Sequence, residues 1–222
     1  MRNPWLSLPE VAPFVLESDK QSILDFNRIA RPYHQIHLEE LPEPYTGNPL
    51  ANIILLNLNP GFYKRNELFR REGGDAYTYF VKANRANLIH GYQEYPFYHL
   101  DPNNKESPGY YWWSRKLKQL ISRYEAKKVA SEVCAIEYFP YLSEHFGCDH
   151  FIMPSQRYTF HLVEEALKRN ACVIVMRRKN LWERAIPLLK DYHYFTLKVP
   201  QVAAISEKNC PDGYREIVKM LG

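Results

Sequence analysis

Short, almost continuous apolar runs constrain the fold of this chain more than any other feature of its sequence. They lie at residues 52–58, 132–138 and 172–177, and residues 194–199 form a fourth, weaker candidate strand. The first three do not alternate between polar and apolar side chains, which is typical of parallel strands covered on both faces. All of them fall well short of the roughly 18 apolar residues that a membrane-spanning helix needs.

Helical patterns separate the predicted strands. Apolar side chains recur at helical spacing over residues 113–124, 155–170 and 181–189, and residues 214–221 predict a closing helix. Asn170 should end the second of these helices, because asparagine tolerates a left-handed backbone. Strands that alternate with helices imply right-handed crossovers. We therefore predict an α/β fold with an open sheet.

The composition favours one soluble domain and does not indicate a particular binding partner. The chain has 222 residues, of which 45% are hydrophobic and 24% charged, and its formal net charge is +4. This length suggests a single domain over residues 1–222, with residues 1–45 as an N-terminal helical or irregular extension. The small positive excess permits a polyanionic partner without requiring one. Pro4 and Pro9 interrupt the start, which is unlike a secretory signal, so we expect a cytoplasmic monomer that contacts no membrane.

The cysteine and histidine patterns do not indicate a metal or any other cofactor. The four cysteines are scattered and form no C-x-x-C pair, which argues against a zinc knuckle or an iron–sulfur cluster. Histidines occur close together at residues 34–37 and 145–150, but neither segment contains a complete set of four ligands. Buried free thiols, no metal and no cofactor are the expectation.

The residues that follow each predicted strand are the first candidates for a functional site, because an open parallel sheet binds ligands beyond the carboxyl ends of its strands. The first strand leads into Asn59-Pro60-Gly61, a turn that could hold the Asn59 amide in a fixed orientation toward a cleft. An ordinary β-turn explains the same tripeptide. The other strands lead into polar, aromatic and cationic residues: Glu137 and Tyr138, Arg177 to Lys179, and the loop 200–209.

Three of these segments resemble one known family. Residues 54–62, Ile-Leu-Leu-Asn-Leu-Asn-Pro-Gly-Phe, look like the first motif of the uracil-DNA glycosylase superfamily in its mismatch-specific and single-strand-selective branches. Residues 134–141 are similar to the middle segment of the family, and residues 200–209 resemble its late Pro-x-x-x-x-x-Ser loop. The resemblance implies a four-stranded, mainly parallel sheet in a three-layer α/β/α arrangement. It also implies that DNA binds across the strand ends with its target base flipped into the cleft.

The resemblance also assigns roles to individual residues. Asn59 would orient the attacking water at C1′ of the deoxyribose, and catalysis would depend on positioning and electrostatic stabilisation, because a neutral amide cannot deprotonate that water. Phe62 or Tyr63 would stack on the flipped base, and Glu137 and Tyr138 would contact it. The remaining candidates would contact the DNA backbone or line the cleft: Gly61, Arg177, Arg178, Gln201, Ser206 and Asn209.

Three positions depart from the family pattern. Glu137 stands where the uracil readers carry asparagine, and an ionised carboxylate suits an exocyclic amine better than O4 of uracil. Val199 replaces a histidine that would stabilise the leaving base, and Asn59 replaces the aspartate of the fastest branch, which predicts a slow enzyme. An equally weighted interpretation makes Glu137 a structural carboxylate paired with Arg177 or Arg178.

The leading hypothesis is therefore a metal-independent, monofunctional DNA glycosylase that removes a damaged or unusual base from single- or double-stranded DNA. A rival hypothesis is a catalytically inactive module that binds nucleic acid or a nucleotide in the same cleft. A third is a nucleotide-handling enzyme that uses the Asn59 turn and Arg177 on free phosphates. For the leading hypothesis we expect Asn59, Glu137 and Ser206 to line one concave pocket.

Overall fold

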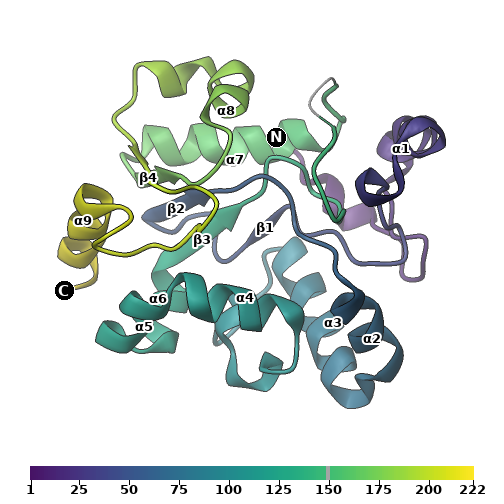
Figure 1. Ribbon diagram of the computed structural model, residues 1–222, viewed down its shortest axis with the longest axis horizontal. Coiled ribbons are helices and arrows are strands. Elements are labelled where there is room, and N and C mark those ends of the chain that lie inside the picture. Colours follow the sequence, from purple (N-terminus) through teal and green to yellow (C-terminus); the bar gives the residue numbers. More distant parts are fainter. Residues whose placement is uncertain (149–150) are drawn as a thin grey trace.

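A five-stranded mixed sheet lies at the centre of the computed structural model, with helices on both of its faces (Figure 1). The structure describes residues 1–148 and 151–222. The strands, in their order across the sheet, are β1 (Tyr45–Thr46), β3 (Val133–Ile136), β2 (Ile53–Leu56), β4 (Cys172–Val175) and β5 (Phe195–Thr196). The pairs β3–β2, β2–β4 and β4–β5 are parallel, whereas β1 pairs with β3 in the antiparallel direction.

The predicted α/β class is confirmed, and the predicted strands are present. The sheet differs from a four-stranded one because β1 extends it at one edge. Leu56 pairs with both Ile136 and Val175, so the three central strands end at the same level. The residues that follow these strands, which include Asn57 and Glu137, therefore lie at the same edge of the sheet.

Helices of varied length connect the strands. The α-helices of the described chain are α1 (Glu17–Ile29), α2 (Lys64–Glu72), α3 (Gly74–Leu88), α4 (Pro108–Lys116), α5 (Lys118–Tyr124), α6 (Ala126–Glu132), α7 (Gln156–Lys168), α8 (Lys179–Ala185) and α9 (Pro211–Leu221). Short 3-10 helices cover Pro4–Ser7, Pro32–His34, Tyr98–Leu100, Pro102–Asn104 and Pro187–Lys190. Within the described ranges, no helix combines the length and the apolar composition that crossing a membrane requires.

Two helix boundaries compare differently with the sequence prediction. The apolar stripe over residues 113–124 predicts one helix, but Leu117 leaves helical geometry with φ −103° and ψ 11°, which divides the segment into α4 and α5. Asn170 follows α7 with φ 58°, the left-handed conformation that the sequence predicts there.

Side chains from alternate positions of each central strand enter different hydrophobic clusters. Ile54 and Leu56 pack with α1, α3, α7 and α8, whereas Ile53 and Leu55 pack with α4, α5, α6 and α9. In Figure 1, α7 and α8 lie on one side of the sheet and α4 to α6 on the other. The four cysteines are buried and free, as the sequence predicts.

The N-terminal segment contributes to the same core as the sheet. It contains α1 and two of the 3-10 helices, and Trp5 and Ile23 are buried in the first hydrophobic cluster. The ring of Trp5 packs edge-on against Tyr141, with 5.9 Å between ring centroids. Residues 1–45 therefore share their packing with the elements that follow β3.

Candidate functional site

A polar cavity lies at the edge of the sheet where β2 and β3 end. Its volume is about 110 Å³, comparable with the roughly 150 Å³ of an engineered cavity that binds one benzene ring. The lining comes from the residues after β2 and β3, from the start of α4, and from Glu43, His99 and Arg177. This is the edge at which open parallel sheets bind ligands.

Asn57 and Glu137 form a buried part of the cavity wall. Each directly follows its strand, and the amide Nδ2 of Asn57 donates a hydrogen bond of 3.0 Å to Oε1 of Glu137. Oδ1 of Asn57 and Oε2 of Glu137 have no hydrogen-bond partner among the described residues. A buried polar atom without a partner costs about 1–3 kcal/mol. The two free oxygens therefore favour a polar ligand in the cavity.

The surroundings of Glu137 change its charge state. Burial of this side chain, which is 6% exposed, raises its pKa to about 8, because the ionised form loses its hydration. The hydrogen bond from Asn57, the charge of Arg177 and the nearby backbone of Leu58 oppose this rise in pKa, and the charge of Glu43 reinforces it. At neutral pH the protonated acid dominates, so Oε2 can act as a hydrogen-bond donor. The sequence-based preference for an exocyclic amine assumed an ionised carboxylate, and that assumption is wrong for this environment.

Arg177 and Arg178 do not neutralise Glu137. Within the described residues, the Glu137 carboxyl group forms no ion pair with either arginine. Arg177 lines the cavity, and its buried Nε has no hydrogen-bond partner there. Arg178 is exposed and precedes α8 with a left-handed φ of 51°. The interpretation of Glu137 as half of a structural ion pair is therefore not supported by the geometry.

The Asn59 turn leaves β2 and places Asn59 on the cavity wall. Its amide Nδ2 donates to the carbonyl of Pro60 at 3.0 Å, and to the carbonyl and hydroxyl oxygens of Ser143 at 3.3 and 3.1 Å. A parallel bridge between Gly61 and Ser143 fixes the same turn. These contacts hold the side chain by its nitrogen, which leaves Oδ1 as an acceptor for a water molecule or a ligand.

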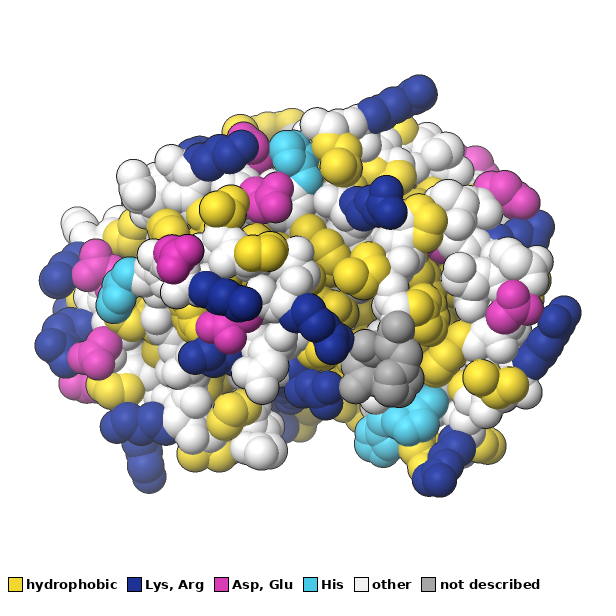
Figure 2. Space-filling model, turned by 90° about the horizontal axis from the view of Figure 1, so that it is seen from above, with side chains coloured by type: hydrophobic (Ala, Val, Ile, Leu, Met, Phe, Trp, Pro, Cys, Tyr) yellow, Lys and Arg dark blue, Asp and Glu magenta, His cyan; other side chains and the backbone are white. Residues whose placement is uncertain are grey.

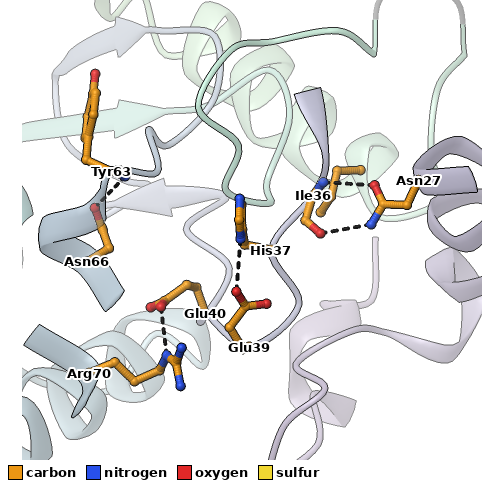
Figure 3. A network of polar contacts seen from close by, with 8 residues as sticks. All are labelled: Asn27, Ile36, His37, Glu39, Glu40, Tyr63, Asn66 and Arg70. Carbon is orange, nitrogen blue, oxygen red and sulfur yellow. Dashed lines mark hydrogen bonds and ion pairs between the residues drawn. The ribbon is translucent and has the colours of Figure 1, made fainter. Parts of the chain in front are cut away.

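The two aromatic residues after this turn have different surroundings. Tyr63 is 58% exposed and lines the cavity, and its backbone N–H donates to Oδ1 of Asn66 at the start of α2 (Figure 3). Phe62 is 7% exposed and stacks on His37, with 3.5 Å between ring centroids. Tyr63 is therefore the member of this pair that can contact a ligand in the cavity.

Tyr138 lies in the core beneath the cavity edge. It is almost fully buried, and its ring packs edge-on against Trp182 with 5.3 Å between centroids. The indole Nε1 of Trp182 donates to the backbone carbonyl of Asn57 at 2.9 Å. Tyr138 therefore supports the strand edge and is absent from the described lining of the cavity.

The late loop is held together by Asn209. Its Oδ1 accepts from the backbone N–H of Val199 at 2.8 Å, and its Nδ2 donates to the carbonyl of Ala204 at 3.0 Å. The hydroxyl of Ser206 accepts from the backbone N–H of Asn209, and Gln201 is exposed. The described lining of the cavity includes none of these side chains.

The residues expected to share one pocket are thus only partly brought together. Asn59 and Glu137 line the cavity, and Ser206 does not. Asn57, Glu43 and His99 also line it and were not among the residues predicted from the sequence. Glu43 and His99 are 56 positions apart, the first in a loop and the second in a short 3-10 helix, where neither periodicity nor a motif marks them.

A group of cations stacks on two aromatic rings of α4, one of which belongs to the cavity lining. Arg65 and Arg115 lie 4.8 and 5.3 Å from the ring centroid of Tyr111, and Lys116 lies 5.1 Å from the ring of Trp112. Trp112 itself lines the cavity. We refer to Arg65, Tyr111, Trp112, Arg115 and Lys116 as the α4 rim.

Comparison with known proteins gives no family assignment. No family model matches the chain, and neither a curated protein nor a solved structure matches it. Among the residues that the structure describes, no group of three or more His, Cys, Asp and Glu side chains could hold a metal ion. The chemistry of the cavity itself is therefore the basis for a functional assignment.

Proposed function

We propose that this protein is a DNA base-excision hydrolase of the uracil-DNA glycosylase type, which cleaves the N-glycosidic bond of a flipped damaged or unusual base. The observation that supports this proposal is the pair of unpartnered oxygens of Asn57 and Glu137, which share a cavity of single-ring size with Asn59. The edge of a nucleobase presents adjacent donors and acceptors that such atoms can pair with. In this proposal the sheet and its two helical layers are the three-layer scaffold of that family.

Asn59 would hold the attacking water. Its amide nitrogen is bound to the main chain, so its Oδ1 is the atom that can accept a hydrogen bond from the water. The amide does not remove a proton, and rate acceleration would come from positioning and from stabilisation of the positively charged sugar. These effects fit a slow hydrolase.

Glu137 and Asn57 would bind the base by two complementary hydrogen bonds. The protonated carboxyl of Glu137 donates from Oε2, and Oδ1 of Asn57 accepts. This pair fits a base edge on which an acceptor lies next to an N–H donor. Uracil presents O4 beside N3–H, and cytosine presents N3 beside its exocyclic amine. Pyrimidines of both kinds are therefore candidate substrates.

The α4 rim supports nucleic acid as the partner. Cations can contact phosphates, and exposed aromatic rings such as Tyr111 can stack on bases. Partial burial lowers the pKa of Lys116, and the charges of the neighbouring Arg177 and Arg115 lower it further, so three cationic side chains lie near one another there. By contrast, Figure 2 shows Lys and Arg interspersed with acidic and hydrophobic side chains on the side that carries α7 and α8.

The test is strand scission at abasic sites. Oligonucleotides that carry a panel of lesions, including uracil and modified cytosines, are incubated with the protein and then treated with alkali. The wild-type protein should produce scission at one or more lesions, and Asn59→Ala should abolish it. Asn52→Ala is the matched control, because Asn52 is exposed at the opposite end of β2. Scission that persists in Asn59→Ala would contradict the proposed role of Asn59.

A second candidate function is a catalytically inactive module that binds nucleic acid in the same cleft. The observation that favours it is the late loop, which carries Val199 where the family has a histidine and adds no described side chain to the cavity. If no lesion gives scission while the protein still binds nucleic acid in a salt-sensitive way, the binding module becomes the function of this cleft.

A further inference from the structure

A histidine side chain faces the same cavity from the 3-10 helix Tyr98–Leu100. His99 is 1% exposed, and its Nε2 lies 2.9 Å from Oε2 of Glu43. Its other ring nitrogen, Nδ1, is buried and has no hydrogen-bond partner among the described residues. An unpartnered buried nitrogen is destabilising, and this one belongs to a side chain that lines the cavity.

Glu43 determines which ring nitrogen carries the proton. A carboxylate only accepts hydrogen bonds, so Nε2 of His99 carries a hydrogen and Nδ1 holds a lone pair in the neutral ring. The backbone N–H of Glu43 donates to the carbonyl of Pro140 at 2.8 Å, which fixes the main chain at this residue. When the ring takes up a second proton, Nδ1 becomes a donor and the Glu43 charge stabilises the imidazolium. Nδ1 can therefore exchange a proton with a ligand.

Gly109 packs closely against the Nδ1 side of this ring. It is the second residue of α4 and lines the cavity with His99. A Cβ at this position would overlap Nδ1 and Cε1 of the imidazole. Any side chain larger than hydrogen would therefore cover the nitrogen that has no partner.

We propose that His99 is a catalytic residue of this site and that Glu43 is its positioning residue. The inference rests on the proposed function. The bond between C1′ and the base nitrogen breaks, and its electron pair leaves with the base, which takes the proton from Nδ1 of the imidazolium. Water adds its oxygen to C1′, and the proton that it releases returns to the imidazole. The net change is hydrolysis, with one water consumed and one neutral base released.

Other titratable or charged groups surround this ring. Glu137, Glu144, Tyr63 and Arg177 line the same cavity, and the ring of Tyr98 lies 4.4 Å from that of His99. Because each of these groups can influence a pH profile, the test compares variants of His99 and Glu43 with the wild-type protein.

The first experiment is a pH profile of base release under single-turnover conditions. In the wild-type protein the rate should fall as pH rises, because only the imidazolium can give a proton to the leaving base. His99→Gln should be about 100-fold slower at pH 6 and should lack this pH dependence. Glu43→Gln should weaken the pH dependence of base release, because the imidazolium loses its counter-charge. His193→Gln is the matched control, since His193 is exposed.

The second experiment detects His99 without catalysis. Long-range ¹H–¹⁵N NMR spectra report the protonation of each imidazole nitrogen, and addition of free uracil or cytosine should shift the Nδ1 signal of His99. Gly109→Ala should abolish this response while the protein remains folded by circular dichroism.

The outcomes separate the two proposals. Wild-type base release that is unchanged in His99→Gln at every pH would overturn the role of His99 and leave the proposed function standing. A wild-type protein that releases no base would overturn the proposed function and with it the catalytic role of His99, while a shifted Nδ1 signal would still place His99 at a ligand site. If neither uracil nor cytosine shifts the Nδ1 signal, His99 does not contact a base in the cavity.

Discussion

The buried carboxyl groups of Asp19 and Glu137 have opposite surroundings. Oδ2 of Asp19 accepts from the hydroxyl of Tyr141 at 2.8 Å, and Oδ1 accepts from the backbone N–H of Ser155 at 3.1 Å. Glu137 has one oxygen bound by Asn57 and one that faces the cavity without a described partner. Burial alone therefore does not distinguish a structural carboxyl group from a functional one; for Glu137 the distinction is an unpartnered oxygen on a side chain that lines a cavity.

The largest expected effect is the contribution of Glu137 to the pH dependence of the free energy of unfolding. Its pKa is about 8 in the folded protein against an ordinary 4.5, so the folded chain holds this proton more tightly than the unfolded chain. The contribution to stability is full below about pH 4.5 and is lost as pH rises through about 8. At about 1.36 kcal/mol per pKa unit, the loss is at most about 5 kcal/mol.

Glu137→Gln should remove this pH dependence, because glutamine does not titrate. Urea unfolding of both proteins between pH 5 and about pH 9 measures it. The free energies of unfolding should diverge as pH rises, with the variant the more stable at high pH. Parallel profiles would show that Glu137 is ionised in the fold.

Asp19→Ala should have the next largest effect. The substitution leaves the Tyr141 hydroxyl and the Ser155 N–H without their acceptor, at about 1–3 kcal/mol for each buried group. We expect the free energy of unfolding to fall by about 3 kcal/mol. Glu137→Gln at pH 5 keeps an acceptor for Asn57 and should change the free energy of unfolding by less than about 1 kcal/mol. Equal losses in the two variants, measured by chemical denaturation, would show that both carboxyl groups stabilise the fold to the same extent.

Two tyrosines give the smallest expected effects. Tyr141→Phe removes the donor to Asp19 and should cost about 1–2 kcal/mol. Tyr63→Phe removes an exposed hydroxyl at the cavity mouth and should stay within about 0.5 kcal/mol of wild type. Thermal unfolding compares them. A Tyr63→Phe protein as unstable as Tyr141→Phe would make Tyr63 part of the structural framework.

The central strands could be predicted from the sequence because each is a run of consecutive buried apolar residues, such as Ile53–Leu56. The edge strand Tyr45–Thr46 could not, because two residues carry no periodicity and its pairing with β3 is a tertiary contact. The break at Leu117 was equally inaccessible, since it changes the backbone while the apolar stripe continues.

Part of the site could be predicted because its residues come shortly after a strand, although Asn57 was not singled out. Asn59 and Glu137 follow β2 and β3, and strand order in a parallel sheet brings such residues to one edge. The pattern could not tell Phe62 from Tyr63, because His37 decides which ring is buried. The protonation of Glu137 also depends on burial that no local pattern encodes.

The most direct test of the claim that Glu137 faces a ligand is the ¹³C NMR titration of its side-chain carboxyl. The signal is assigned by its loss in Glu137→Gln. It should titrate near pH 8, and free uracil or cytosine should displace it at neutral pH in the wild type and in Asn52→Ala. A titration near the ordinary pKa of 4.5, with no response to either base, would contradict the account.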